Sequence, residues 1–125
     1  MNVVVDTSSW ISYLRGDPEE KLDVALQEGR VFLPPIVVAE LLSGVQSARH
    51  REKLIDLLQE LPLCEADFDH WVRVGQLRHT LARKALSIST PDAHVAQCTL
   101  DLEGYLLTDD RVFNRIGRLT SLKTL

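Results

Sequence analysis

Acidic side chains stand at several positions where a strand ends or a helix begins, and together they could hold a metal ion. Like charges gathered in one pocket raise one another's pKa, so such a cluster is costly unless cations occupy it. Oxygen ligands suit Mg²⁺ or Mn²⁺ rather than zinc. One or two such ions would orient and activate water for in-line attack on a phosphodiester. The acids are Asp6, Glu40, Asp92 and one of the adjacent pair Asp109 and Asp110.

Asp6 directly follows an unbroken β-branched run, Val3–Val5, which fits a parallel strand buried on both faces. In open α/β sheets the ligand site lies beyond the carboxyl ends of the strands, so Asp6 would lie at its floor. The hydroxyl residues Thr7, Ser8 and Ser9 could then cap the following helix. The alternative is that Asp6 is only a helix cap.

Glu40 and Asp92 have structural alternatives of the same kind. Glu40 is the single charge in an apolar helix expected over Ile36–Val45, and it could simply face solvent. Its helix begins where a strand ends, however, so its second turn can reach the edge that carries Asp6. Asp92 lies in the first turn of a helix that we expect Thr90 to cap, with Pro91 at the first position. There it could merely interact with the helix dipole, worth about 0.3–1 kcal/mol.

Strands alternate with helices along the whole chain, which indicates one α/β domain over residues 1–125. We expect a three-layer α/β/α sandwich with a central parallel sheet of four to five strands. The predicted strands are Val3–Val5, Val31–Leu33, Pro62–Cys64, Tyr105–Leu107 and Ser121–Leu125. The predicted helices are Ser8–Leu14, a helix capped by Asp17 with Pro18 at its first position and ending near Gly29, Ile36–Val45, Arg49–Leu61, Phe68 to about Leu86, Thr90 to about Leu102, and Arg111–Arg115.

The longest predicted helix is capped by Asp67. Two of its histidines, His70 and His79, are nine residues apart and do not share a face, which excludes a zinc site built from that pair. Its predicted inner face consists of Trp71, Val74, Leu77, Leu81 and Ala85.

The formal charge is -4, from 18 acidic and 14 basic residues, which at face value argues against a polyanionic partner. The inference is weak, because metal-bound acids would leave the remaining charges balanced. Basic side chains also cluster, although each cluster is more typical of a solvated helix face. These clusters are Arg49, Arg51 and Lys53; Arg78, Arg83 and Lys84; and Arg111, Arg115 and Arg118.

Cysteine usage and hydropathy indicate a soluble protein in a reducing, cytoplasmic setting. Cys64 and Cys98 lie far apart without metal-ligand spacing, and each has the apolar neighbours of a buried free thiol. No apolar run approaches the roughly 18 residues needed to span a bilayer, and the N-terminus lacks a signal peptide. We therefore expect no membrane partner.

Four segments resemble the motifs of PIN-domain ribonucleases, in the same order. They are VVVDTS (3–8), VVAELLSG (37–44), PDAHVA (91–96) and LLTDDRVF (106–113), and the chain has the size of the VapC-type toxins of toxin–antitoxin modules. The resemblance implies an endoribonuclease that depends on Mg²⁺ or Mn²⁺ and hydrolyses RNA phosphodiesters. It also implies a homodimer that a small cognate antitoxin inhibits.

Position by position, Asp6, Glu40 and Asp92 match the family's first three acids. The fourth matches Asp110, because the usual pattern is Thr, any residue, Asp, two residues, Phe. Asp109 falls where the family often has Arg or Asn, and it is the alternative fourth ligand. The resemblance thus implies that these acids are the catalytic and metal-binding residues.

Two hydroxyl residues, Thr7 and Thr108, match positions that orient ligands or water in the family. The chain departs from the pattern in two places. It lacks the usual glycine before the third motif, and His94 stands where an apolar residue is common. Both departures concern the local loop shape and the RNA preference more than the metal site, and no RNA-binding residues are predicted.

Other functions remain open at this stage. A PIN-like module could bind RNA or protein without catalysis, or a PIN nuclease could process RNA without an antitoxin. A phosphoryl-transfer receiver domain fits poorly, because its acid pair follows the first strand, whereas here the pair is near the C-terminus. A haloacid-dehalogenase-like phosphatase would need a second Asp where Ser8 stands.

Overall fold

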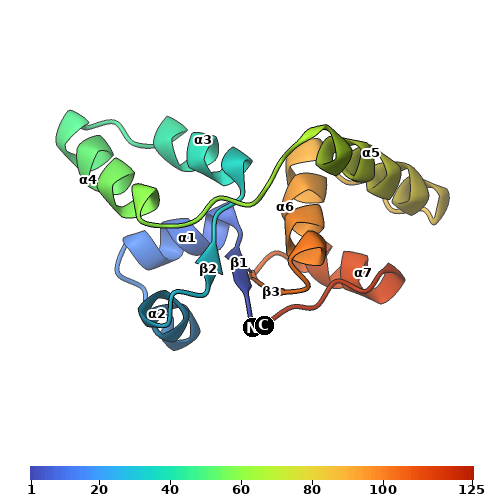
Figure 1. Ribbon diagram of the computed structural model, residues 1–125, viewed down its shortest axis with the longest axis horizontal. Coiled ribbons are helices and arrows are strands. Elements are labelled where there is room, and N and C mark those ends of the chain that lie inside the picture. The colour runs from blue at the N-terminus through green and yellow to red at the C-terminus, as the bar shows by residue number, and fades with distance from the viewer.

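A parallel sheet with strand order β2-β1-β3 forms the centre of the computed structural model, which describes residues 1–125 (Figure 1). Strand β1 (Val3–Val5) lies between β2 (Val31–Phe32) and β3 (Tyr105–Leu107). All three valines of β1 are fully buried, as expected for a β-branched run covered on both faces. The predicted parallel α/β sheet is therefore confirmed.

Each edge of the sheet is extended by a single parallel bridge. Leu33 pairs with Leu63, and Leu106 pairs with Thr124. The predicted edge strands 62–64 and 121–125 are thus present only as short backbone contacts. Leu33 donates to the carbonyl of Pro62 at 2.9 Å, for example, and the amide of Cys64 donates back to Leu33.

Seven helices flank the sheet: α1 (Thr7–Leu14), α2 (Glu20–Gln27), α3 (Pro35–Ser43), α4 (Ala48–Gln59), α5 (Phe68–Arg83), α6 (Thr90–Asp101) and α7 (Arg111–Leu119). Helix α6 contacts β1, β3 and α5, while α2 contacts β2 and α3 contacts α1, α4 and α6. In Figure 1, α1 to α4 lie to one side of the strands and α5 to α7 to the other, with the two termini together. None of the helices combines the length and apolarity needed to cross a membrane.

Two helix starts differ from the prediction. Glu19, not Asp17, caps α2, because the chain is still leaving α1 at that point: Gly16 has φ +100° and the amide of Asp17 donates to the carbonyl of Ser12. Ser89, not Thr90, caps α6, and its hydroxyl accepts from the amide of Asp92 at 3.2 Å.

Helix α5 begins at its predicted Asp67 cap but ends at Arg83, short of Leu86. Ala85 has a left-handed φ of 66°, and the amide of Leu86 donates to the carbonyl of Leu81 at 2.9 Å. This closing motif usually has glycine in the left-handed position, so an alanine there does not indicate the end of a helix. Conversely, α7 extends past Arg115 to Leu119.

The prediction of which residues form the inner face of α5 was partly wrong. Val74, Leu77 and Leu81 are buried as predicted, but Trp71 is 40% exposed. His70 occupies the interior instead, with no exposed surface.

Gly104 fixes the approach of β3 to β1. A Cβ atom at this position would lie 2.6 Å from the carbonyl oxygen of Asn2, and Tyr105 donates its amide to that same carbonyl at 2.9 Å. Only glycine allows β3 to pair here, and β3 leads directly to Thr108 and Asp110.

Candidate active site

Asp6, at the end of β1, is 5% exposed, and its carboxylate accepts three hydrogen bonds. Its Oδ1 accepts from the backbone amide of Ser9 at 2.9 Å and from the Ser8 hydroxyl at 3.2 Å, so Asp6 caps α1. The prediction that Thr7, Ser8 and Ser9 supply the cap was therefore wrong. Its Oδ2 accepts a hydrogen bond from the Thr108 hydroxyl.

Thr108 connects the ends of two neighbouring strands. Besides donating to Asp6, its hydroxyl oxygen accepts from the amide of Asp110 at 3.0 Å. The Asp110 carboxylate in turn accepts from the amide of Val112 at 3.0 Å and caps α7. These contacts hold the two acidic segments at the same edge of the sheet.

Glu40 on α3 is exposed to solvent, which was the alternative to a functional role. It nevertheless faces the edge of the sheet that carries Asp6. The Thr7 hydroxyl at the start of α1 donates to Oε1 of Glu40 at 2.7 Å. Since Thr7 is the neighbour of Asp6, this hydrogen bond brings the second motif to the end of β1.

Asp92 lies in the first turn of α6 and shows that the four acids share one electrostatic environment. Burial raises the pKa of Asp92 most, and a hydrogen bond with Ser89 opposes that rise. The charges of Asp110, Glu40 and Asp6 raise it further.

Asp109 and Asp110 are both exposed, but only the charge of Asp110 is among the causes that raise the pKa of Asp92. The structure therefore brings Asp110, rather than Asp109, into the electrostatic environment of the other three acids. We call Asp6, Glu40, Asp92 and Asp110 the acidic edge.

The donor set of the acidic edge fits a hard divalent cation. It offers carboxylate oxygens and threonine hydroxyls and no nitrogen or sulfur ligand, as Mg²⁺ and Mn²⁺ prefer. The raised pKa of Asp92 shows that the negative charges oppose one another in the protein alone.

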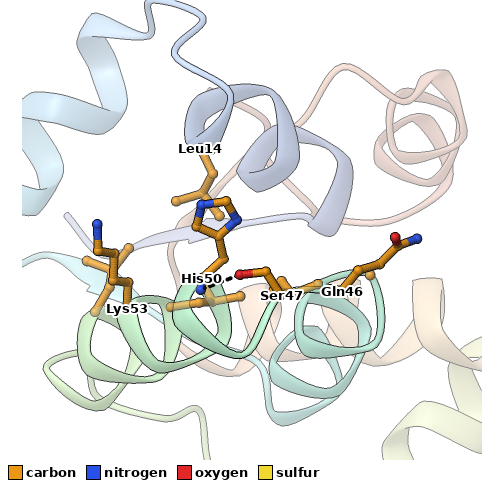
Figure 2. A pocket seen from close by; sticks show the side chains of 9 residues that line it. Leu14, Gln46, Ser47, His50 and Lys53 are labelled. Atoms are coloured by element: carbon orange, nitrogen blue, oxygen red, sulfur yellow. Dashed lines mark hydrogen bonds between the residues drawn. The ribbon is translucent and has the colours of Figure 1, made fainter.

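A hollow of about 680 Å³ lies elsewhere, between the end of α1 and the start of α4. Leu14 faces His50 across it, and Lys53 lies on the same helix as His50 (Figure 2). None of the four acids lines this hollow, so it is separate from the acidic edge.

The sequence analysis missed a second group of reactive side chains. His70, His94 and Cys98 meet between α5 and α6, fully or almost fully buried. The spacing of four residues between His94 and Cys98 on one helix was the available signal, but the partner from α5 could not be read from spacing. Cys64 and Cys98 are buried free thiols, as predicted, and they line the same cavity.

The sequence profile described as PIN domain matches residues 3–119. Among solved structures, a chain of Rickettsia felis VapBC2 bound to a promoter DNA fragment is 20% identical, with a TM-score of 0.80 and coverage of 100% of this chain and 98% of that one. DNA-bound VapBC from Salmonella typhimurium gives 21% identity, a TM-score of 0.79, and coverage of 100% and 97%. A chain of a toxin–antitoxin complex from Klebsiella pneumoniae is 17% identical, with a TM-score of 0.71 and coverage of 88% of each chain.

At these identities the similarity to solved structures establishes the fold. No curated protein gives a significant match to the sequence.

Proposed function

Because the chain belongs to the PIN domain family, whose toxins are nucleases, we propose that it is an Mg²⁺- or Mn²⁺-dependent endoribonuclease that acts as the toxin of a type II toxin–antitoxin system. One observation supports this most strongly. Four segments that are far apart in the sequence bring Asp6, Glu40 and Asp110 close enough to Asp92 for their charges to raise its pKa. Gathering like charges in this way is costly unless a cation binds there, and such local conflicts are expected at functional sites.

In this proposal Asp6, Glu40, Asp92 and Asp110 hold the metal. When bound, the metal activates a water molecule and stabilises the charge that develops on the phosphodiester. The protein's own part is to fix the carboxylates. Asp6 is held on both oxygens by α1 and Thr108, so it cannot rotate freely.

The threonine hydroxyls position the remaining acids. Thr7 donates to Glu40, and Thr108 holds the backbone of Asp110, so neither hydroxyl needs to take part in proton transfer. Their role is to keep the acids in place as the metal and substrate arrive.

Basic side chains next to the acidic edge are suited to the RNA backbone. Arg111 and Arg115 are exposed on α7, which begins directly after Asp110. Cations beside a metal-neutralised acidic site would attract phosphates from either side of the scissile bond. This offsets the overall charge of -4.

We propose that the partner is a small antitoxin, since the similar structures include toxin–antitoxin and VapBC complexes. The acidic edge would accept an arginine of the antitoxin, whose planar guanidinium pairs with carboxylates through two hydrogen bonds. An adjacent groove of about 520 Å³ between α3 and α4 suits an amphipathic segment, because seven of its eight lining residues are hydrophobic. Helix α3 carries both Glu40 and part of this groove, so one partner could reach both.

We also propose that the protein is a homodimer in the cytoplasm. Apolar side chains are exposed at the start of α5, with Phe68 81% and Val72 41% exposed. Burying such a patch against a second copy removes it from water. Sedimentation should give the mass of a dimer, and a monomer at micromolar concentration would exclude this assembly.

RNA cleavage tests the proposed activity directly. Purified protein is incubated with a labelled RNA that contains single-stranded and looped segments, in Mn²⁺ and in excess EDTA. We expect cleavage with Mn²⁺ and none in EDTA. Full activity after chelation would rule out the metal-dependent mechanism, and binding without cleavage in Mn²⁺ would favour a catalytically silent module.

The adjacent acids at the end of β3 supply a matched pair of variants. We expect Asp110→Asn to reduce cleavage by roughly a hundredfold or more, because it removes a metal ligand. Asp109→Asn removes an equal charge from the preceding residue and should retain most activity. Equal losses would mean that overall charge, rather than the acidic edge, controls cleavage.

A further inference from the structure

Helices α5 and α6 pack around side chains that coordinate metals in many proteins. His70, His94 and Cys98 are 0%, 0% and 1% exposed, and their ligand atoms all lie within 4.8 Å of one another. We propose that these three residues, with Cys64 as fourth ligand, form a structural site for a borderline-soft divalent ion such as Zn²⁺. We call the four residues the His–Cys cluster.

The distances within the cluster are close to those of a tetrahedral site. Zinc–nitrogen bonds of about 2.0–2.1 Å and zinc–sulfur bonds of about 2.3 Å imply N···N separations near 3.3 Å and N···S separations near 3.6 Å. Nε2 of His70 lies 2.7 Å from Nδ1 of His94, and Sγ of Cys98 lies 4.0 Å and 3.9 Å from these two atoms. Small side-chain rotations, which part the nitrogens and draw in the sulfur, would therefore complete the geometry.

A carboxylate already orients one of the ligands. Nδ1 of His70 lies 2.9 Å from Oδ2 of Asp101, and a carboxylate accepts hydrogen bonds, so this nitrogen carries the proton. The lone pair of Nε2 then points into the cluster. Metal-bound histidines are typically held in this way through their second nitrogen.

Asp101 is itself fixed by two further side chains. Arg73 donates to both of its oxygens at 3.1 Å and 3.0 Å, and the amide of Gln97 donates to Oδ1 at 2.8 Å. Because these hydrogen bonds fix Asp101, its carboxylate keeps the His70 ring in one orientation even without a metal.

The second histidine is also held in place. The ring of Trp71 stacks on that of His94, with centroids 4.6 Å apart and planes inclined by 10°. The His70 ring meets His94 edge-on at 4.8 Å. Little side-chain freedom remains to be lost when a ligand binds.

Cys64 supplies the fourth ligand and lies beside the route of entry. It is buried beside the bridge between Leu33 and Leu63 that extends the sheet edge. Cys64, Cys98 and Asp101 together line a cavity of about 520 Å³, which gives an ion access to the sulfur side of the cluster.

Metal binding would replace the hydrogen bond that joins the two histidines and the protons on the two thiols. His94 donates its Nδ1 proton to Nε2 of His70, and its Nε2 lies 3.7 Å from Sγ of Cys98. On binding, the His94 proton moves to Nε2, and the two thiols release their protons to solvent as thiolates. The ion therefore enters as M²⁺, two protons leave, and no oxidant or reductant is needed.

Cobalt titration of the full-length protein tests the site, with excess Mg²⁺ present to occupy the oxygen ligands of the acidic edge. We expect one Co²⁺ per chain, with a near-ultraviolet thiolate-to-cobalt charge-transfer band and the intense visible absorption of tetrahedral Co²⁺. Zn²⁺ should displace the cobalt and remove both bands. Cobalt binding without the charge-transfer band would overturn the proposal.

Variants assign the bands to these residues. Cys98→Ser and Cys64→Ser should each reduce the charge-transfer band by roughly half, because each removes one of the two thiolates. His79→Gln, which alters an exposed histidine on the same helix as His70, should leave the band unchanged. Asp101→Asn leaves every ligand in place and should weaken cobalt binding by roughly 10–100-fold. The cobalt affinity of Asp101→Asn therefore tests the site even if Cys98→Ser does not fold. Unchanged affinity in Asp101→Asn would contradict the proposed site.

Discussion

The acidic edge and the His–Cys cluster both gather reactive side chains from segments far apart in the sequence, but they are stabilised in opposite ways. In the acidic edge, like charges oppose one another, and burial and neighbouring carboxylates raise the pKa of Asp92. Next to the His–Cys cluster, burial alone would raise the pKa of Asp101, which orients His70, but hydrogen bonds from Arg73, His70 and Gln97 lower it. The acids need a cation from outside, whereas the cluster is internally satisfied.

Acid should destabilise the protein mainly through the His–Cys cluster. Burial, and then the charge of His70, lowers the pKa of His94 from 6.5 to about 4. Between these values the unfolded chain binds a proton that the native protein does not, so stability falls as the pH drops through this window. The shift corresponds to about 3 kcal/mol of unfolding free energy at about pH 4, relative to about pH 7.

Urea unfolding in EDTA across this range measures the effect. His94→Gln cannot take up the proton and should show a flatter dependence on pH, whereas His79→Gln should follow the wild type. The titratable groups that face His94 are His70 and Cys98, and both are retained in His94→Gln and in His79→Gln. Identical slopes for wild type and His94→Gln would place the acid sensitivity elsewhere.

The acidic edge depends on strand backbone, which Gly104→Ala would disturb. The added Cβ would meet the carbonyl oxygen of Asn2 at 2.6 Å, and backbone cannot rotate aside, so we expect a loss of about 1–3 kcal/mol. Gly75→Ala in α5 adds the same methyl group to open space and should stabilise by about 0.5–1 kcal/mol. Denaturant midpoints compare the two, and a neutral Gly104→Ala would contradict the close approach of β3 to β1.

Thr108→Val removes the hydroxyl that links Asp6 to the backbone of Asp110. We expect a loss of about 1 kcal/mol in unfolding free energy and reduced RNA cleavage, because both acids lose a positioning contact. Thr108→Ser retains the hydroxyl and should recover most of both. If Thr108→Val cleaved RNA like the wild type, the link between the two acidic segments would have no functional role.

The sheet could be predicted from the sequence because it leaves local signals. Val3–Val5 is a continuous β-branched run, and Asp6 marks the residue at which it ends. Asp6 turned out to have two roles, since it caps α1 as well as lying in the acidic edge. The cap and the functional position had been weighed as alternatives, but the structure allows both.

The His–Cys cluster could not be predicted because it depends on how two helices pack. His70 was compared with His79 on its own helix, while its contacts are His94 and Asp101 on α6. The end of α5 was missed for a different reason. Ala85 adopts a left-handed conformation that its residue type does not favour.

The thermal stability of Asp92→Asn, with EDTA and with excess Mn²⁺, tests the central claim most directly. This variant removes one charge from the acidic edge, and Asp92, unlike Asp6, is not the N-cap of a helix. Because the pKa of Asp92 is raised in the folded protein, its ionised form costs stability at neutral pH. The account predicts that in EDTA the variant melts at or above the wild-type temperature, most clearly at low salt, and that Mn²⁺ stabilises the wild type more than the variant. Equal destabilisation of Asp92→Asn in EDTA and in Mn²⁺ would contradict a metal site at the acidic edge.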